Sequence, residues 1–249
     1  MSKRRKKPAK KSGKWILPAL AIGLVIVVLL AVVPLLGQNG QEDPGVTETS
    51  PTVLKQDPLI NKIEFPLLLS DGMLEIESVF QYDGLNPDCG NKDGKNIAAI
   101  TLKNLSGAYL TRADIRIKSS DGKTLHFVVT DLPAGGTVLA FSVDNVSIKA
   151  GTSYGDPVCE AVFDYNIPAQ DDRVSASVDG TRIILQNNTD QQIGEIVVYC
   201  HATLGDQLFG GITYSYTVYN LIAGGTATLD AVDCILGLAE VARIVINEP

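Results

Sequence analysis

The residues of this chain that could carry out catalysis are few and scattered. The two histidines, His126 and His201, both lie in stretches with β-strand alternation, without the neighbours that a catalytic triad or a histidine metal site requires. By alternation, His201 faces solvent. No glycine-rich nucleotide-binding motif or metalloprotease motif is present. We therefore predict no catalytic residue, no metal site and no cofactor, and a protein that is not an enzyme.

Four cysteines, Cys89, Cys159, Cys200 and Cys234, form the second set of reactive groups. None has the C-x-x-C spacing typical of a zinc or redox site. An even number of cysteines outside the cytoplasm is typical of disulfides. Of the three possible pairings, the internal repeat described below favours Cys89 with Cys159 and Cys200 with Cys234. Free buried thiols are the alternative.

The densest set of oxygen ligands is DGLNPDCGNKDGKN, residues 83–96. Aligning Asn91–Gly94 with an EF-hand loop places Cys89 at the first ligand position and Ile100 at the twelfth, where carboxylates are required. The EF-hand register therefore fails. We expect a solvated loop between two strands, and an irregular calcium site is the alternative.

Tyrosines concentrate in FGGITYSYTVY, residues 209–219. In a strand, Tyr214 and Tyr216 share one face and Tyr219 points to the other. Such tyrosines can bind sugar rings or a protein surface, although packing of one face in the core would also explain them. We take Phe209, Tyr214, Tyr216 and Tyr219 as a candidate surface for a protein or glycan partner.

β-Strands are the elements predicted to position these residues. Ile115 and Ile117 alternate with charged residues, which is the pattern of a strand with one buried face. Asp-Gly between two such runs is a strong hairpin signal, and a type I′ turn needs positive φ at both positions. Beyond residue 59 no segment has a convincing helical stripe, apart from a candidate turn near residues 235–239. The hairpin pairs are Asp71-Gly72, Asp121-Gly122 and Asp179-Gly180.

The β-rich region contains an internal repeat, residues 98–167 and 182–247, with an insertion in the second copy around residues 209–216. Two copies indicate duplicated domains, because a solenoid needs three or more repeats. The size of each copy is that of an immunoglobulin-like sandwich. The aligned positions are Asn104 with Asn187, Leu110 with Ile193, Ile115 with Val198, Ile117 with Cys200, and the turn LPAGGT (132–137) with LIAGGT (221–226).

The N-x-S/T turn after one strand and the L-x-A-G-G-T turn before another resemble the small Ig-like repeats of Gram-positive cell-surface proteins, such as the FxLYD-type group. The Phe-x-Leu-Tyr-Asp string itself is absent, and the segment 162–165, VFDY, is a distant counterpart. The layout as a whole resembles uncharacterised single-pass Firmicutes proteins with two such domains. The resemblance implies an extracytoplasmic location and a binding or spacer role, and it supplies no catalytic residue.

Residues 15–36 form an uncharged apolar stretch of 22 residues. As a helix it would be about 33 Å long, enough to span a hydrocarbon layer of about 30 Å. Residues 1–14 carry eight Lys and Arg and no acid, whereas residues 15–249 have a net charge of −15. A basic flank stays in the cytoplasm, so the C-terminal part is expected outside. We predict an uncleaved signal-anchor, with a cleaved signal peptide as the alternative.

The sequence therefore predicts an all-β extracytoplasmic part behind a single transmembrane helix. We expect a non-enzymatic binding or spacer protein of the cell envelope, or alternatively an accessory subunit of an integral membrane complex. The membrane is one partner, a protein or glycan outside the cell is another, and a short basic tail beside a membrane does not favour nucleic acid. The predicted segments are a basic tail (1–14), an anchor (15–36), a flexible linker (37–58), a first antiparallel sandwich (59–167), a linker (168–172) and a second sandwich (173–249).

Overall fold

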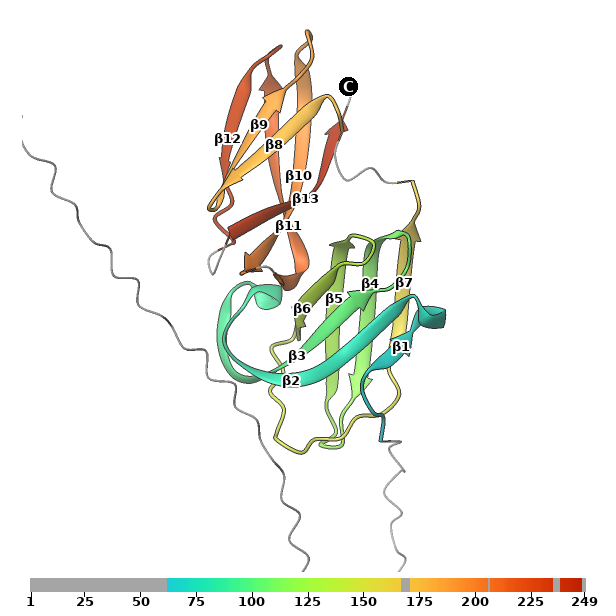
Figure 1. The fold of residues 1–249 in the computed structure, drawn as a ribbon. Helices are drawn as coiled ribbons and strands as arrows, with labels where there is room; N and C mark the ends of the chain where they lie inside the picture. Colours follow the sequence, from blue (N-terminus) through green and yellow to red (C-terminus); the bar gives the residue numbers. More distant parts are fainter. Residues whose placement is uncertain (1–61, 167–170, 206, 235–237, 248–249) are drawn as a thin grey trace, which may run out of the picture. The chain divides into compact units, whose positions relative to one another are not determined.

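The described part of the chain is all-β, as predicted (Figure 1). Within it, no helix is long and apolar enough to cross a membrane. The predicted tail, anchor and linker lie outside the described residues. All described residues belong to one compact unit, residues 55–249. The computed structural model describes residues 62–166, 171–205, 207–234 and 238–247.

The strands divide into two halves that follow each other along the chain. The first half consists of β1 (Leu67–Leu69), β2 (Leu74–Asn86), β3 (Lys92–Asn104), β4 (Tyr109–Lys118), β5 (Thr124–Leu132), β6 (Thr137–Phe141) and β7 (Val158–Asp164), with the 3₁₀ turns η1 (Ser70–Gly72) and η2 (Pro87–Cys89). The second half consists of β8 (Val174–Asp179), β9 (Arg182–Asn187), β10 (Ile193–Leu204), β11 (Gln207–Leu221), β12 (Thr226–Asp230) and β13 (Leu238–Asn247).

The same strand arrangement recurs in both halves. The order β5-β4-β7 in the first half corresponds to β11-β10-β13 in the second, and β2-β3-β6 corresponds to β8-β9-β12. One difference joins the halves: β6 and β11 are neighbours, so a seven-stranded sheet runs β1-β2-β3-β6-β11-β10-β13. The sequence repeat therefore corresponds to a structural duplication with one shared sheet.

The three Asp-Gly pairs each connect antiparallel strands, so the predicted hairpins are confirmed. The predicted type I′ turn is wrong for two of them. Asp71 and Gly72 both have positive φ, 56° and 84°, whereas in the other two pairs only Gly122 and Gly180 do, at 80° and 69°. In the Gly122 turn, the glycine N–H donates to Ser119 O instead, at 3.0 Å.

Each half has its own apolar core. Ile115 and Ile117 of β4 are fully buried in the first core, and their predicted counterparts Val198 and Cys200 of β10 are fully buried in the second. Burial of such side chains is the main favourable contribution to folding. The alternation in the sequence thus correctly identified the inward faces of the two central strands.

A buried asparagine closes the corresponding turn in each half. The Nδ2 of Asn104 donates to the carbonyls of Ala108, Leu132 and Pro133, at 2.9, 3.2 and 3.1 Å. Its Oδ1 accepts from the backbone and hydroxyl of Ser106. The aligned Asn187 repeats every one of these bonds, with Thr189 in the place of the serine and the carbonyls of Gln191, Leu221 and Ile222 as acceptors.

Candidate functional site

The insertion in the second repeat joins the two halves. It forms the beginning of β11, where Leu208 pairs with Val138 and Phe209 with Leu139 of β6 in parallel register. This pairing connects the sheets of the two halves. The extra residues of the second copy thus have a structural use that the alignment alone did not indicate.

An aromatic cluster packs beside this strand pair. The rings of Tyr82 and Phe141, from the first half, lie 4.7 Å apart, and Phe209 of the second half lies 4.9 Å from Phe141 and 5.8 Å from Tyr82. The tilted and edge-on arrangements are those that aromatic rings prefer. Phe209, predicted as part of an interaction surface, is buried in this cluster.

Asp88 of η2 is the central polar residue of the junction. Its carboxylate accepts backbone N–H bonds from Phe141 and Gly211 at 2.8 Å and from Ile212 at 3.0 Å, so it binds both halves. Burial raises the pKa of Asp88 to about 6, and the three N–H donors oppose that rise. The expected solvated loop is therefore wrong at this residue, because the second half covers it.

Asp131, at the end of β5, forms a second buried contact between the halves. Its Oδ2 accepts from the Thr213 hydroxyl at 2.8 Å, and its Oδ1 lies 3.0 Å from Nε of Arg243. The Tyr109 hydroxyl, in the first half, lies 3.4 Å from the same Oδ1. A buried carboxylate with a cationic partner and hydroxyl donors is well compensated.

His201 lies in the junction and not on the surface. His201 is only 1% exposed, and its Nε2 lies 3.3 Å from the carbonyl oxygen of Asp131. The prediction of a solvent-facing histidine is therefore wrong. Strand β10 has a register irregularity between Cys200 and Ala202, and the first half covers the face that alternation assigns to water. Burial lowers the pKa of His201.

The tyrosines of β11 lie in two different environments. Tyr214 donates to the carbonyl of Pro87 at 3.2 Å and Tyr216 donates to Oδ2 of Asp233 at 2.8 Å, and both rings pack against the second core. Tyr219, on the other face, is 64% exposed. Of the four residues in the predicted surface, Tyr219 is the one that solvent reaches freely.

All four cysteines are free thiols in the structure. Cys200 and Cys234 are buried next to each other: a hydrogen bond between them raises the pKa of the Cys200 thiol and lowers that of Cys234. Cys159, in β7, packs on the first core and lies 3.5 Å from the Ser70 hydroxyl, whereas Cys89 lies in η2 beside β6 and β11. Both disulfides remain predictions.

His126 is the other histidine, and its ring faces carboxylates on both sides. Its Nε2 lies 3.1 Å from Oδ2 of Asp114 and its Nδ1 lies 3.8 Å from Oδ2 of Asp144. Arg116 also pairs with Asp114, at 2.9 Å. Asp114 thus contacts both His126 and Arg116, and the four residues form a cluster of acidic and basic side chains. Among the described residues, no group of three or more His, Cys, Asp or Glu is arranged to hold a metal ion.

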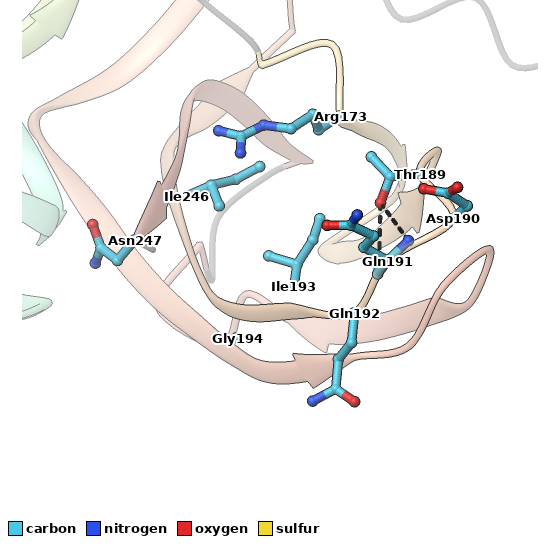
Figure 2. A pocket seen from close by; sticks show the side chains of 9 residues that line it. All are labelled: Arg173, Thr189, Asp190, Gln191, Gln192, Ile193, Gly194, Ile246 and Asn247. Carbon is cyan, nitrogen blue, oxygen red and sulfur yellow. Dashed lines mark hydrogen bonds between the residues drawn. The ribbon is translucent and has the colours of Figure 1, made fainter. Parts of the chain in front are cut away.

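A cavity of about 530 Å³ opens at the end of the second half, around the turn that Asn187 closes (Figure 2). Ile193 and Ile246 pack against the second core and supply apolar surface, while amides, a hydroxyl and an ion pair between Arg173 and Asp171 supply polar groups. A side chain at Gly194 would meet open space. The lining residues are Arg173, Thr189, Asp190, Gln191, Gln192, Ile193, Gly194, Ile246 and Asn247.

An exposed surface lies beside this cavity, and we call Gln192, Tyr219, Asn220 and Ile222 the end surface. The Nε2 of Gln192 donates to Oδ1 of Asn220 at 3.0 Å. Tyr219 and Ile222 are each 64% exposed. The four side chains carry no charge, and Gln192, Tyr219 and Asn220 can both donate and accept hydrogen bonds. Glu195, which pairs with Tyr219, adds a carboxylate beside them.

Comparison with known proteins found no matching family model, no matching curated protein and no matching solved structure.

Proposed function

We propose that this chain is a non-enzymatic, membrane-anchored protein on the outer side of the cell membrane. Its two Ig-like β-sandwich halves act as one rigid spacer that carries the end surface and its adjoining cavity to a partner. The observation that carries the proposal is Asp88, a buried carboxylate of the first half that binds backbone N–H groups of both halves.

A rigid spacer is supported by the character of the junction. A strand pair, an aromatic cluster and two buried carboxylates connect the halves. If the halves separate, the backbone N–H of Gly211 and the hydroxyl of Thr213 lose their acceptors and the aromatic cluster around Phe209 is exposed to water. The junction thus favours one fixed arrangement over two domains that move independently.

The location is supported by the sequence. Residues 15–36 are long and apolar enough to span a membrane, and the eight positive charges of residues 1–14 favour a cytoplasmic N-terminus. A binding role rather than catalysis is supported by the end surface, which offers apolar area and neutral hydrogen-bonding groups. The partner outside the cell is a protein or a glycan.

Protease added to intact cells tests the proposed topology on the full chain. The β-rich part should be lost and a fragment with residues 1–36 should be retained, whereas permeabilised cells should lose both. Protection of residues 62–247 in intact cells would contradict the proposal. Replacing residues 15–36 with an unrelated span provides the second arm: loss of a stoichiometric integral partner after this exchange would favour an accessory subunit instead.

A further inference from the structure

Strand β8 has a neighbouring strand on one side only. It lies at the end of the sheet β12-β9-β8, so in the described part of the chain no strand pairs with its other side. Its counterpart in the first half, β2, is paired on that side by β1, in antiparallel register (Figure 1). The duplication therefore contains the same edge twice, once covered by a strand and once open.

The two edges correspond residue by residue. Leu74 of β2 pairs with Asn104, and Val174 of β8 pairs with Asn187. The two asparagines close the same turn in each half, so Leu74 and Val174 are equivalent. The next equivalent positions are Glu75 with Ser175 and Ile76 with Ala176.

The backbone points the same way at both edges. The carbonyl of Met73 accepts from the N–H of Leu105 at 2.8 Å, and the equivalent carbonyl of Arg173 accepts from the N–H of Asn188 at 2.9 Å. Successive peptide groups of a strand point to opposite sides, so the next residue and the second one after it direct their N–H and C=O groups to the outer edge. These outward residues are Leu74 and Ile76 in β2 and Val174 and Ala176 in β8.

The covering strand closes the first core, and the second core lacks such a cover. Leu67 and Leu69 of β1 pack against the first core, and Ile76, which pairs with Leu67, is 0% exposed. The equivalent Ala176 is only partly buried. In the second half the N–H of Val174 donates to a nearby carbonyl in the turn before β8, so the edge left for a partner begins at the Val174 carbonyl.

Two cavities lie between β8 and the last strand, β13. One, of about 510 Å³, is lined by Ala176, Val178 and Leu238, and the other is the cavity of Figure 2 at the start of β8. Val178 is 40% exposed and Leu238 is 55% exposed. Ala239 of β13 donates to the carbonyl of Gly180 at 3.0 Å, which closes the far end of this space. Apolar surface is thus open beside an unpaired strand edge.

We propose that the edge of β8 binds an extended segment of a partner polypeptide, which pairs antiparallel with β8 as β1 pairs with β2. A glycan has no backbone N–H and C=O groups with which to continue a β-ladder, so the edge selects a polypeptide. Two apolar residues separated by one other, like Leu67 and Leu69, face the second core. Glu240, which lines the same cavity, favours a basic residue before them.

The inference rests on the proposed function, because the cavity at the start of β8 is the one presented to a partner, and it names that partner as a polypeptide. One short strand buries little area, so we expect weak binding, with a dissociation constant on the order of micromolar or above.

A synthetic peptide, acetyl-KKLLLSG-amide, tests this inference on the full chain in detergent micelles. It carries the sequence of residues 67–70 behind two lysines, and photoreactive leucine replaces its first and third leucines. After illumination, mass spectrometry should place the crosslinks at residues 174–178 and 238–241. Crosslinks distributed over the whole chain, or none at these residues, would overturn the inference.

N-methylation of the probe provides a matched control that leaves the protein unchanged. A methyl group on the nitrogen of the first leucine removes an N–H that faces β8, and we expect it to reduce crosslinking at least about fivefold. A methyl group on the middle leucine, whose N–H points away from β8, should have little effect. Equal crosslinking by the two methylated probes would show that no β-ladder forms.

A pair of protein variants tests the apolar lining. Leu238→Asp places a charge where an apolar residue of the probe would be buried, and it should reduce crosslinking at least about fivefold. Val162→Asp, at a β7 residue 60% exposed, is the matched control and should behave as wild type. Equal yields from Leu238→Asp and wild type would contradict the proposed site. The topology experiment on intact cells is unaffected by any of these results, so the two proposals fail separately.

Discussion

A single asparagine side chain holds each turn at the end of a half. Asn187 satisfies three backbone carbonyls and accepts two bonds from Thr189. No shorter or apolar side chain can replace this set, and a buried carbonyl without a partner is costly. The conformation of this turn therefore depends on the side-chain amide of Asn187 rather than on apolar packing.

Asn187→Ala should lower the free energy of unfolding of the full chain by about 3 kcal/mol, because several buried groups lose their partners. Urea unfolding followed by circular dichroism measures this. The neighbouring, exposed Asn188→Ala is the control and should cost less than about 1 kcal/mol. Equal effects for the two variants would show that the amide network does not stabilise the turn.

The raised pKa of Asp88 makes the free energy of unfolding depend on pH, in a direction that can be stated. Its pKa is raised to about 6 from an ordinary 3.8, so the folded protein binds this proton more tightly than the unfolded chain. The resulting stabilisation is complete below the unfolded pKa and is lost as pH rises through about 6. Asp88→Asn removes this contribution and leaves that of His201 in place.

We therefore expect Asp88→Asn to cost about 2 kcal/mol more at pH 4.5 than at pH 8, relative to wild type at each pH. Urea unfolding curves of wild type and Asp88→Asn at the two pH values give the four free energies of unfolding that are compared. A cost that is the same at both values, or larger at pH 8, would contradict the raised pKa.

The buried thiols Cys200 and Cys234 give a prediction about covalent structure. They lie within hydrogen-bonding contact of each other in the second core, and the proposed location is an oxidising one. Mass spectrometry of alkylated, unreduced protein from cell envelopes should find a peptide pair linked through these two residues. Recovery of both as alkylated free thiols would contradict it.

Strand β11 is the element on which the junction depends. A side chain at Gly211 would come within 2.3 Å of the carbonyl oxygen of Val128 and 3.0 Å of Cβ of Ala140. The glycine allows β11 to lie against β5 and β6 of the first half. Gly211 belongs to the insertion of the second repeat. The insertion therefore brings β11 into close contact with the first half.

Gly211→Ala should destabilise the full chain by about 2 kcal/mol, because overpacking at a backbone contact forces strands apart. Gly194→Ala, where a methyl group meets open space, is the matched control and should leave stability within about 0.5 kcal/mol of wild type. Thermal unfolding by circular dichroism compares the two. An unchanged melting temperature for Gly211→Ala would show that the strands adjust without loss.

Local patterns predicted the elements well. The Asp-Gly pairs marked hairpins, the alternation around Ile115 marked an inward face, and the Asn104 and Asn187 motifs marked a duplicated turn. These features depend on residues close in sequence. The turn type failed at Asp121 and Asp179 because a glycine alone can supply the required positive φ.

The junction could not be predicted in the same way, because its partners are far apart in the chain. Asp88 and Gly211 are separated by more than a hundred residues, and no short motif links them. His201 reads as solvent-facing until the first half is placed over it. The alignment marked an insertion near residues 209–216 but did not indicate that its residues pair with β6 of the first half.

At the scale of the whole molecule, the described part of the chain contains two copies of one fold that make different contacts. The first copy uses its Asp131 end to hold the second, and the second leaves the equivalent Asn220 end exposed. An anchored chain built in this way would carry its open end on a fixed support. Presentation of that end to a partner therefore depends on the rigidity of the junction.

Pulsed electron paramagnetic resonance measures that rigidity directly. Spin-labelled amino acids at the exposed Val162 of the first half and Val178 of the second leave the cysteines untouched, and excess unlabelled chain suppresses distances between copies. The account predicts one narrow distance distribution for the full chain, broadened when Asp88 and Asp131 are both replaced by alanine. A broad distribution in the chain with its natural junction would contradict it.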